Sequence, residues 1–424
     1  MNGLMPLALA SLLVGAGAGL IAALFRLALE QADLMRNAVA AWAQEAGASG
    51  WLLMVAGTAI ATAAAALLVR RFSPEASGSG IPHVEAVVAG EAVPASPLLL
   101  PVKFLGGLLA IGGGLALGRE GPSVQMGASI AHFLGPRFHL TESDCRALVA
   151  AGAGAGLATA FNAPIAGAVF VLEELVRRFD LRTTIASLGA SAMAIAVARP
   201  LIGQTPDFPV DLLPPMKFFG LPLYLALGVA AGVAGALYTR AVVGALHMAD
   251  RLGGWPVELR AALIGAGVGT LAFIAPGAVG GGDALTQQAL AGGGAAGAVA
   301  LMFLFRFAYG PLCYAAGTPG GLFAPMLVLG AQLGLLLGTA FSALAPGLAG
   351  DPRAFAVVGM SAFFTAVVRA PLTGIALILE LTGEATLLLP LLGSNFAAML
   401  VAAMLGVPPV YDLLRERAAR PDVS

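Results

Sequence analysis

The sequence predicts an all-α membrane protein, a helical bundle with many tilted and broken helices. Of its 424 residues, 59% are hydrophobic and only 11% are charged, whereas soluble domains carry about 25% charged residues. The apolar runs are continuous and of helical length, unlike the short alternating segments of membrane β-barrels. Several runs are shorter than the roughly 20 residues that span a bilayer, and glycine and proline interrupt them, as in transporters with broken helices.

The apolar runs form two series separated by a polar, proline-rich stretch at 203–217. The first series comprises 3–25, 51–69, 98–117, 122–136, 147–160, 164–176 and 183–202. The second comprises 218–246, 258–275, 298–316, 322–346, 354–368, 371–382 and 385–406. The first run lacks a basic n-region and a clear cleavage site, so we expect it to be a retained first helix. The 57 glycines and many alanines predict close helix packing through small side chains.

Four blocks of the first series recur in the same order in the second, at offsets of 202 to 213 residues. The matches are Gly15, Gly19, Leu24 and Phe25 with Gly228, Gly232, Leu237 and Tyr238; Gly78, Gly80 and Gly90 with Gly280, Gly282 and Gly292; Lys103, Phe104, Gly107, Gly118 and Pro122 with Arg306, Phe307, Gly310, Gly321 and Pro325; and Ala163, Pro164, Gly167, Leu172 and Glu173 with Ala370, Pro371, Gly374, Leu379 and Glu380. We therefore predict two homologous halves, 1–205 and 218–411, a connecting segment, 206–217, and a short tail, 412–424. The residues alone leave open whether the halves are parallel or inverted.

The run Gly118-Arg119-Glu120-Gly121-Pro122 separates two apolar segments and carries two charges. Charged side chains at membrane depth are costly, so they indicate function. Pro122 predicts that a helix starts between Glu120 and Pro122, and a helix N-terminus with free N–H groups favours an anion. Gly118 and Gly121 leave room for close approach. We predict an intramembrane anion site that the Glu120 carboxylate can occupy; the alternative is a solvated surface loop.

Two other breaks have the same pattern of glycines followed by proline. Gly78-Ser79-Gly80-Ile81-Pro82 adds a hydroxyl donor, although such a run alone is more often a plain turn. Gly320-Gly321-Leu322-Phe323-Ala324-Pro325 is the repeat partner of the Glu120 region and has no charge. Because repeated halves commonly hold the substrate near the bilayer midplane, the sequence predicts two helix N-termini facing one site.

Two further motifs carry polar side chains. The run Phe161-Asn162-Ala163-Pro164 opens a helix that ends in Glu173 and Glu174, which point in different directions. Glu173 matches Glu380 in the repeat, whereas Glu174 matches Leu381, so we interpret Glu173 as structural and Glu174 as functional. Tyr411 follows Pro408 and Pro409, and on the residues alone it is better interpreted as an interfacial aromatic anchor.

Taken together, GSGIP, GREGP, FNAP followed by EE, GGLFAP and a tyrosine shortly after a proline resemble the CLC family of chloride channels and chloride/proton antiporters. The resemblance covers about residues 10–415 and implies an inverted-repeat fold and a homodimer with one ion pathway per subunit. It makes Glu120 the gating glutamate and Glu174 the internal proton-transfer acid. It assigns chloride binding to Ser79, Tyr411, Gly78 and the N–H groups of Leu322 and Phe323. The supporting residues are Gly118, Arg119, Gly121, Pro122, Gly321, Pro325 and Lys103.

The implied function is secondary active exchange of chloride for protons by a multi-pass protein of a bacterial inner (plasma) membrane. The expected partners are chloride, protons, lipid and a second copy, with no cofactor and no enzymatic activity. Ser79, where some nitrate-preferring relatives have proline, favours chloride. The match to GREGP and to Ser79 also argues against the fluoride-exporting branch, whose filter sequences differ. His83 departs from the glutamate that is frequent there in the family, with Glu85 two residues on. With 13 residues after Tyr411, we expect no cytoplasmic CBS domains and no nucleotide regulation.

Two alternatives remain. The first is a passive chloride channel on the same fold, against which Glu174 argues because channel members usually lack this acid. The second is an intramembrane aspartyl protease, because Gly280-Gly281-Gly282-Asp283 matches GxGD and Tyr411-Asp412 matches YD; the YD pair should come first, and Asp283 is expected in a loop. The net charge of −1 suggests no nucleic-acid partner, and Cys145 and Cys313 indicate neither a disulfide framework nor a zinc site.

Overall fold

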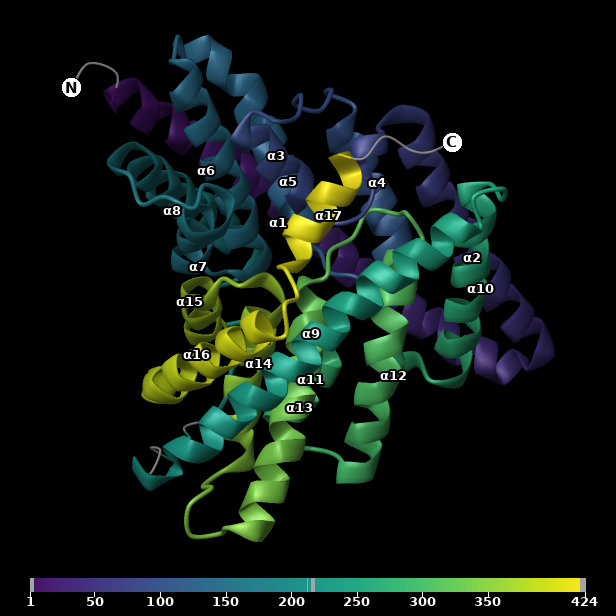
Figure 1. Cartoon of the computed structure of the whole chain (residues 1–424). Helices are drawn as coiled ribbons and strands as arrows, with labels where there is room; N and C mark the ends of the chain where they lie inside the picture. The colour runs from purple at the N-terminus through teal and green to yellow at the C-terminus, as the bar shows by residue number, and fades with distance from the viewer. Residues whose placement is uncertain (1–3, 212, 215–217, 420–424) are drawn as a thin grey trace. The chain divides into compact units, whose positions relative to one another are not determined.

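The structure is a computed structural model that describes residues 4–211, 213–214 and 218–419 (Figure 1). Residues 212 and 215–217 of the predicted connecting segment and 420–424 of the predicted tail lie outside the described residues. The described chain is almost entirely helical: α1 Leu4–Ala46, α2 Ala48–Phe72, α3 Ile81–Ala89, α4 Leu99–Gly112, α5 Glu120–Leu134, α6 Glu142–Phe161, α7 Pro164–Phe170, α8 Leu181–Ile202, α9 Leu221–Arg251, α10 Val257–Ile274, α11 Asp283–Leu290, α12 Ala296–Tyr314, α13 Phe323–Leu344, α14 Pro352–Val368, α15 Pro371–Thr382, α16 Leu388–Met404 and α17 Val410–Ala419. Among these residues, eight helices are long and apolar enough to cross a membrane, which confirms the predicted all-α membrane class.

Helix α1 is much longer than its apolar run. It continues to Ala46 although the predicted apolar run ends at residue 25. The extension carries pairs of opposite charge one turn apart, since Arg26 Nε donates to Glu30 at 2.9 Å and Arg36 Nη1 to Asp33 at 2.5 Å. Such pairs support a helix where its apolar run is interrupted by charges, and buried Leu29, Ala40 and Ala43 continue its packed face.

Three short helices, α3, α11 and α17, begin outside the predicted apolar runs. The expectation that Asp283 lies in a loop is wrong, because Asp283 is the first residue of α11. Its N-cap, Gly282, has a φ of 100°, and Gly80 caps α3 in the same way with a φ of 83°. The matched glycines of the repeat thus mark the same local event, a left-handed residue followed by a short helix.

The chain folds into two compact units. The first comprises Met1–Gln204, Ala245–Gly281 and Leu312–Leu322, and the second comprises Thr205–Gly244, Gly282–Pro311 and Phe323–Ser424. The first unit therefore joins most of the first half to two segments of the second half. The predicted site residues are accordingly divided between the two units.

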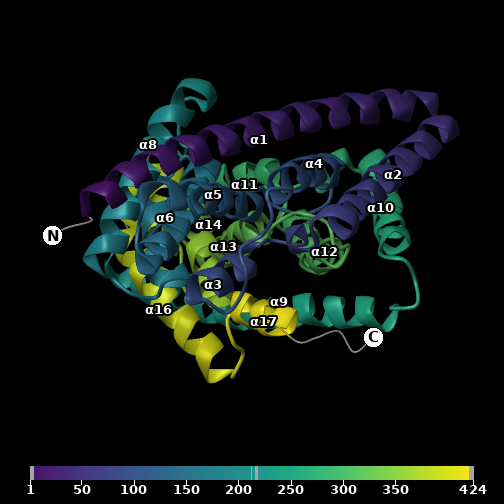
Figure 2. The same ribbon diagram turned by 90° about the horizontal axis from the view of Figure 1, so that it is seen from above.

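In the first unit, α1 packs along α8 and α6, α5 packs on α6, and α2 lies beside α10 in both views (Figures 1 and 2). Small residues make these contacts close. A Cβ on Gly15 would lie 2.3 Å from the Ala190 carbonyl oxygen on α8, and one on Gly19 would lie 2.5 Å from that of Ala194. This confirms the predicted packing through small side chains.

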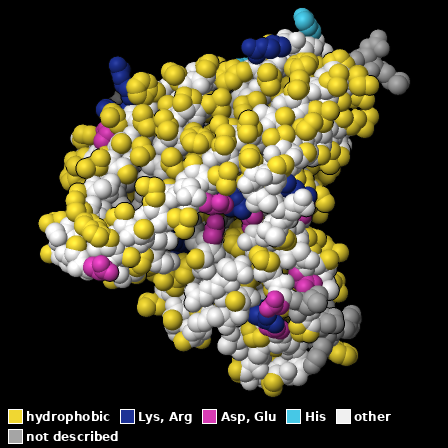
Figure 3. All heavy atoms as spheres, turned by 180° about the vertical axis from the view of Figure 1, so that it is seen from behind, with side chains coloured by type: hydrophobic (Ala, Val, Ile, Leu, Met, Phe, Trp, Pro, Cys, Tyr) yellow, Lys and Arg dark blue, Asp and Glu magenta, His cyan; other side chains and the backbone are white. Residues whose placement is uncertain are grey.

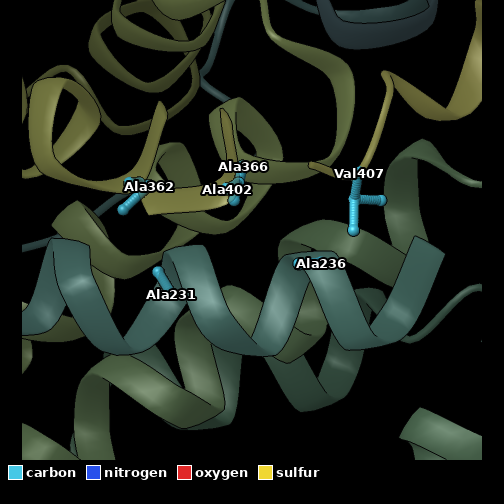
Figure 4. Close-up of a cluster of buried hydrophobic side chains, with 7 residues drawn as sticks. Ala231, Ala236, Ala362, Ala366, Ala402 and Val407 are labelled. Atoms are coloured by element: carbon cyan, nitrogen blue, oxygen red, sulfur yellow. The ribbon is translucent and has the colours of Figure 1, made fainter. Parts of the chain in front are cut away.

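The second unit repeats this packing at the matched positions. A Cβ on Gly228, the partner of Gly15, would lie 2.3 Å from the Ser394 carbonyl oxygen on α16. Next to it, buried small side chains of α9, α14 and α16 form a cluster with Val407: Ala231, Ala236, Ala362, Ala366, Ala398 and Ala402 (Figure 4). The close packing of α9 is therefore again made by glycine and alanine.

An aromatic pair recurs in the same way. The rings of Phe25 and Phe104 are 5.2 Å apart in the first unit, and those of their counterparts Tyr238 and Phe307 are 5.4 Å apart in the second. Both distances fall in the range of favourable aromatic pairs. The sequence repeat is therefore also a repeat of side-chain contacts.

The surface is rich in large apolar side chains. Leu344, Met404 and Ile274 are more than two-thirds exposed, at 83%, 77% and 71%. On the face in Figure 3, hydrophobic side chains are spread widely among the backbone and other side chains, and charged ones form small groups. This surface suits a multi-pass membrane protein, whose outer face meets hydrocarbon rather than water.

Candidate functional site

The glycine-rich breaks come together within the first unit. Gly78 lies beside Pro319 in a short parallel pairing, in which the Gly78 N–H donates to Thr318 O and the Gly320 N–H to Gly78 O, both at 3.0 Å. Gly118 pairs with Gly321 in antiparallel fashion through two hydrogen bonds of 2.8 Å. Residues more than 200 positions apart in sequence are therefore joined directly by backbone hydrogen bonds.

Ser79 lies against the N-terminus of α5. A Cβ on Gly121 would be 2.3 Å from Ser79 Oγ and 2.6 Å from its carbonyl oxygen, so only glycine allows this approach. Helix α5 begins at Glu120, with Pro122 in its first turn, as predicted. Ser79 is 1% exposed and Glu120 2% exposed, which excludes the alternative of a solvated surface loop.

The donors at this point are suited to an anion. The Ser79 hydroxyl is buried and has no hydrogen-bond partner within the described chain, and a buried hydroxyl normally has one. The first N–H groups of α5 have no acceptor inside the helix, and the helix dipole makes this end positive. The arrangement can therefore hold a small anion by hydrogen bonds alone.

Tyr314 and Lys103 hold the Ser79 loop. The Ser79 N–H donates to Tyr314 Oη at 3.3 Å, and Lys103 Nζ donates to Ala76 O at 3.0 Å and Gly78 O at 2.8 Å. Lys103 is fully buried. Gly78 has a φ of 61° and a Cβ there would lie 2.8 Å from Tyr314 Oη, so the loop needs glycine for two reasons. The Arg119 Nε donates to Ala160 O at 3.2 Å.

Glu174 lies in a π-helical turn, Val171–Leu175, which follows α7. Such turns are rare in proteins, and those that occur are often found at functional sites. Glu174 is 3% exposed, whereas Glu173 and its repeat partner Glu380 are half-buried. Arg177 Nη2 lies 3.6 Å from Glu174 Oε1. The two neighbouring acids therefore occupy different environments, as expected from their positions on the helix.

Other predicted chloride ligands lie in the second unit. Phe323 is fully buried and begins α13, with Pro325 in its first turn, and its ring is 4.7 Å from that of Phe364. Tyr411 is also fully buried, in the first turn of α17. The interpretation of Tyr411 as an interfacial aromatic anchor is therefore wrong. Leu322 is buried at the end of the first unit, and the grouping of Phe323 and Tyr411 with Ser79 stays a prediction.

The sequence does not single out Tyr314 or Gln125. Tyr314 ends α12, and its only signal is a polar atom in an apolar run shortly before a glycine-rich break. Gln125 lies one turn after Pro122 and is 1% exposed. A polar side chain at membrane depth is costly, so its place in the first turns of a helix that starts at a functional break is the signal that could have identified Gln125.

The family model described as "Voltage gated chloride channel" matches residues 60–403. The chain belongs to this family. The H(+)/Cl(-) exchange transporter ClcA of Cronobacter sakazakii is 39% identical over 373 residues, which cover 87% of this chain and 80% of that protein. ClcA of Vibrio cholerae is 38% identical over 426 residues, which cover 97% and 89% of the two chains.

The solved structure of a slow cyanobacterial Cl-/H+ antiporter matches this chain with a TM-score of 0.93 and 32% identity. The match covers 97% of this chain and 98% of that one. A CLC-type fluoride/proton antiporter matches with a TM-score of 0.79 at 22% identity, a likeness of fold. These matches confirm the predicted inverted-repeat CLC-type helical bundle. They also favour a transport protein over the intramembrane protease alternative.

Proposed function

We propose that this protein exchanges chloride for protons across a bacterial inner membrane, as the names of its ClcA relatives state for them. One observation carries the proposal: the Ser79 hydroxyl meets the N-terminus of α5 at Gly121, directly beside the buried Glu120. A hydroxyl donor, the positive end of a helix and a carboxylate are thus in one place. An anion and the carboxylate can compete for the same donors.

In the proposed mechanism, the ionised Glu120 carboxylate and chloride take turns at the α5 N-terminus. The same oriented N–H groups stabilise either negative charge, which offsets the cost of burying it. A protonated Glu120 loses this attraction and turns away with its proton, and chloride binds in its place. Exchange follows because one site serves two occupants.

The finer assignments complete the pathway. Glu174, buried in its π-helical turn, delivers protons from the cytoplasmic side. Leu322 and Phe323 contribute N–H donors and Tyr411 a second hydroxyl to the central chloride, and Lys103 keeps the Ser79 loop in position. The protein works as a homodimer with one pathway in each subunit, and it needs no cofactor.

The deciding experiment uses purified protein in liposomes with a chloride gradient and no proton gradient. We expect the chloride gradient to drive protons uphill, which a pH electrode measures as a growing pH gradient. A protonophore should collapse this pH gradient. Empty liposomes are the control. Chloride movement without coupled proton movement would instead support the passive channel.

A further inference from the structure

His83 contacts the helix that carries the anion site. Its Nδ1 is 3.4 Å from Gln125 Nε2, and the same Nε2 donates to Glu75 O at 2.8 Å. An amide nitrogen has only donors to offer, so Nδ1 must present its lone pair. The observed arrangement therefore belongs to the neutral imidazole.

The other end of the Gln125 amide touches the Ser79 loop. Its Oε1 is buried without a hydrogen-bond partner in the described part of the chain, and a Cβ on Gly80 would lie 2.2 Å from it. Gly80 follows Ser79 and caps α3 with a φ of 83°. Gln125 thus connects His83 on one side to the residue next to the chloride-binding serine on the other.

The surroundings of His83 favour its neutral form. The largest influence on the pKa of His83 is burial, which lowers it. The Val93 carbonyl and the Glu75 carboxylate raise this pKa and Lys103 lowers it, so that the pKa lies below its usual value. Helix α5 also brings His132 into the adjoining pocket. Helix α6 brings Arg146, whose Nη1 would lie 2.7 Å from a Cβ on Gly90 at the end of α3, and the π-helical turn packed on α3 carries Glu173 and Glu174. His83 is therefore neutral at pH 7 and becomes charged only on acidification.

Protonation of His83 would place Nδ1–H against the amide N–H of Gln125. The two donors repel until the amide turns by half a rotation, which gives Oε1 to the imidazolium, a stronger charge-assisted bond. Nε2 then leaves Glu75 O and lies against Gly80. A small cavity of about 20 Å³ adjoins His83, Gln125 and Ser129, and exchanging the positions of the amide nitrogen and oxygen needs little additional space.

We propose that His83 and Gln125 are positioning residues for the Ser79 loop, and that protonation of His83 loosens this loop and weakens chloride binding. The proposal rests on the proposed role of Ser79 in binding chloride. It adds a proton sensor separate from Glu120 and Glu174. Acid conditions would then reduce the chloride affinity of the protein independently of exchange.

The test measures the chloride concentration for half-maximal flux in liposomes at about pH 7.5 and about pH 5, in a Glu120→Gln background where Glu120 no longer titrates. We expect this concentration to rise about fivefold at acid pH, the effect of losing one hydrogen bond. His83→Gln and Gln125→Leu should both abolish the rise. His132→Gln, which alters the same pocket but not the amide, should keep it.

A rise that persists in His83→Gln or Gln125→Leu, or one that His132→Gln removes, would overturn the proposal. Ser79→Ala at pH 7.5 distinguishes a failure of the proposed function from a failure of the positioning role alone. If it leaves the half-maximal concentration unchanged, Ser79 does not bind chloride and the proposed function needs another site. If it raises that concentration while His83→Gln retains the pH effect, only the positioning role fails.

Discussion

A Cβ atom on Gly121 would lie 2.3 Å from the hydroxyl oxygen of Ser79. The two residues belong to different breaks, one before α3 and one at the start of α5, and both are buried. Their contact makes the Ser79 hydroxyl part of the environment of the α5 N-terminus. Any side chain at position 121 would therefore collide with Ser79.

Gly121→Ala should push the Ser79 hydroxyl away from the helix and weaken chloride binding about tenfold, because added atoms in a packed region cost about 1–3 kcal/mol. Isothermal titration with chloride measures the change. Gly267→Ala is the matched control, since a Cβ at this helical position meets nothing within 4 Å. Equal affinities in the two variants would show that the contact is unimportant for anion binding.

Glu120→Gln should retain chloride movement and lose proton movement, because an amide cannot carry the proton or compete as an anion. Parallel chloride-electrode and pH-electrode recordings from the same liposomes measure both. Glu142→Gln changes an acid whose side chain is 86% exposed and should behave as wild type. Undiminished proton pumping by Glu120→Gln would remove Glu120 from the mechanism.

Glu174→Gln should keep chloride flux and lose coupling, so that chloride moves with few or no protons. Glu173→Gln is a stringent control because it changes the adjacent, half-buried acid and should leave the ratio of protons to chloride unchanged. The measurement is that ratio in liposomes. Loss of coupling in both variants, or in neither, would mean that protons reach Glu120 by another route.

Asp144 should make stability depend on acid pH. Arg182 donates to its two oxygens at 2.7 and 2.8 Å. Burial raises the pKa of Asp144, but the hydrogen bonds from Arg182 and Thr141 outweigh it and hold the pKa below the usual value. A carboxyl whose pKa is lower in the folded state than in the unfolded state stabilises the fold. This stabilisation is fully present above the unfolded-state pKa, about 3.9, and is lost as the pH falls through the lower pKa of the folded state.

Asp144→Asn should therefore lower the melting temperature in detergent by a few degrees at neutral pH, and the difference from wild type should close in strong acid. Differential scanning fluorimetry across the pH range follows both proteins. Glu142→Gln, close by in the same helix and highly exposed, should show no such convergence. A constant difference at all pH values would indicate a steric effect rather than an ionic one.

Local chemistry predicted the helix starts well. Pro122, Pro164, Pro325 and Pro371 all lie in the first turns of helices, because proline fixes φ and lacks an N–H where none is needed. The end of α1 was harder to predict, since the charged residues that interrupt its apolar run, such as Arg26 and Glu30, pair along the helix while Leu29, Ala40 and Ala43 stay buried.

Short-range patterns were enough to establish the membrane class and the broken helices, because run length and proline act over a few residues. Matches at offsets of 202 to 213 residues established the repeat and, through it, the separate character of Glu173 and Glu174. The folded structure was needed to show that Gly118 pairs with Gly321, that Tyr314 accepts from Ser79, and that Tyr411 is buried. Contacts between segments so far apart depend on how the helices pack, and no local pattern records which distant backbone will supply the missing hydrogen bond.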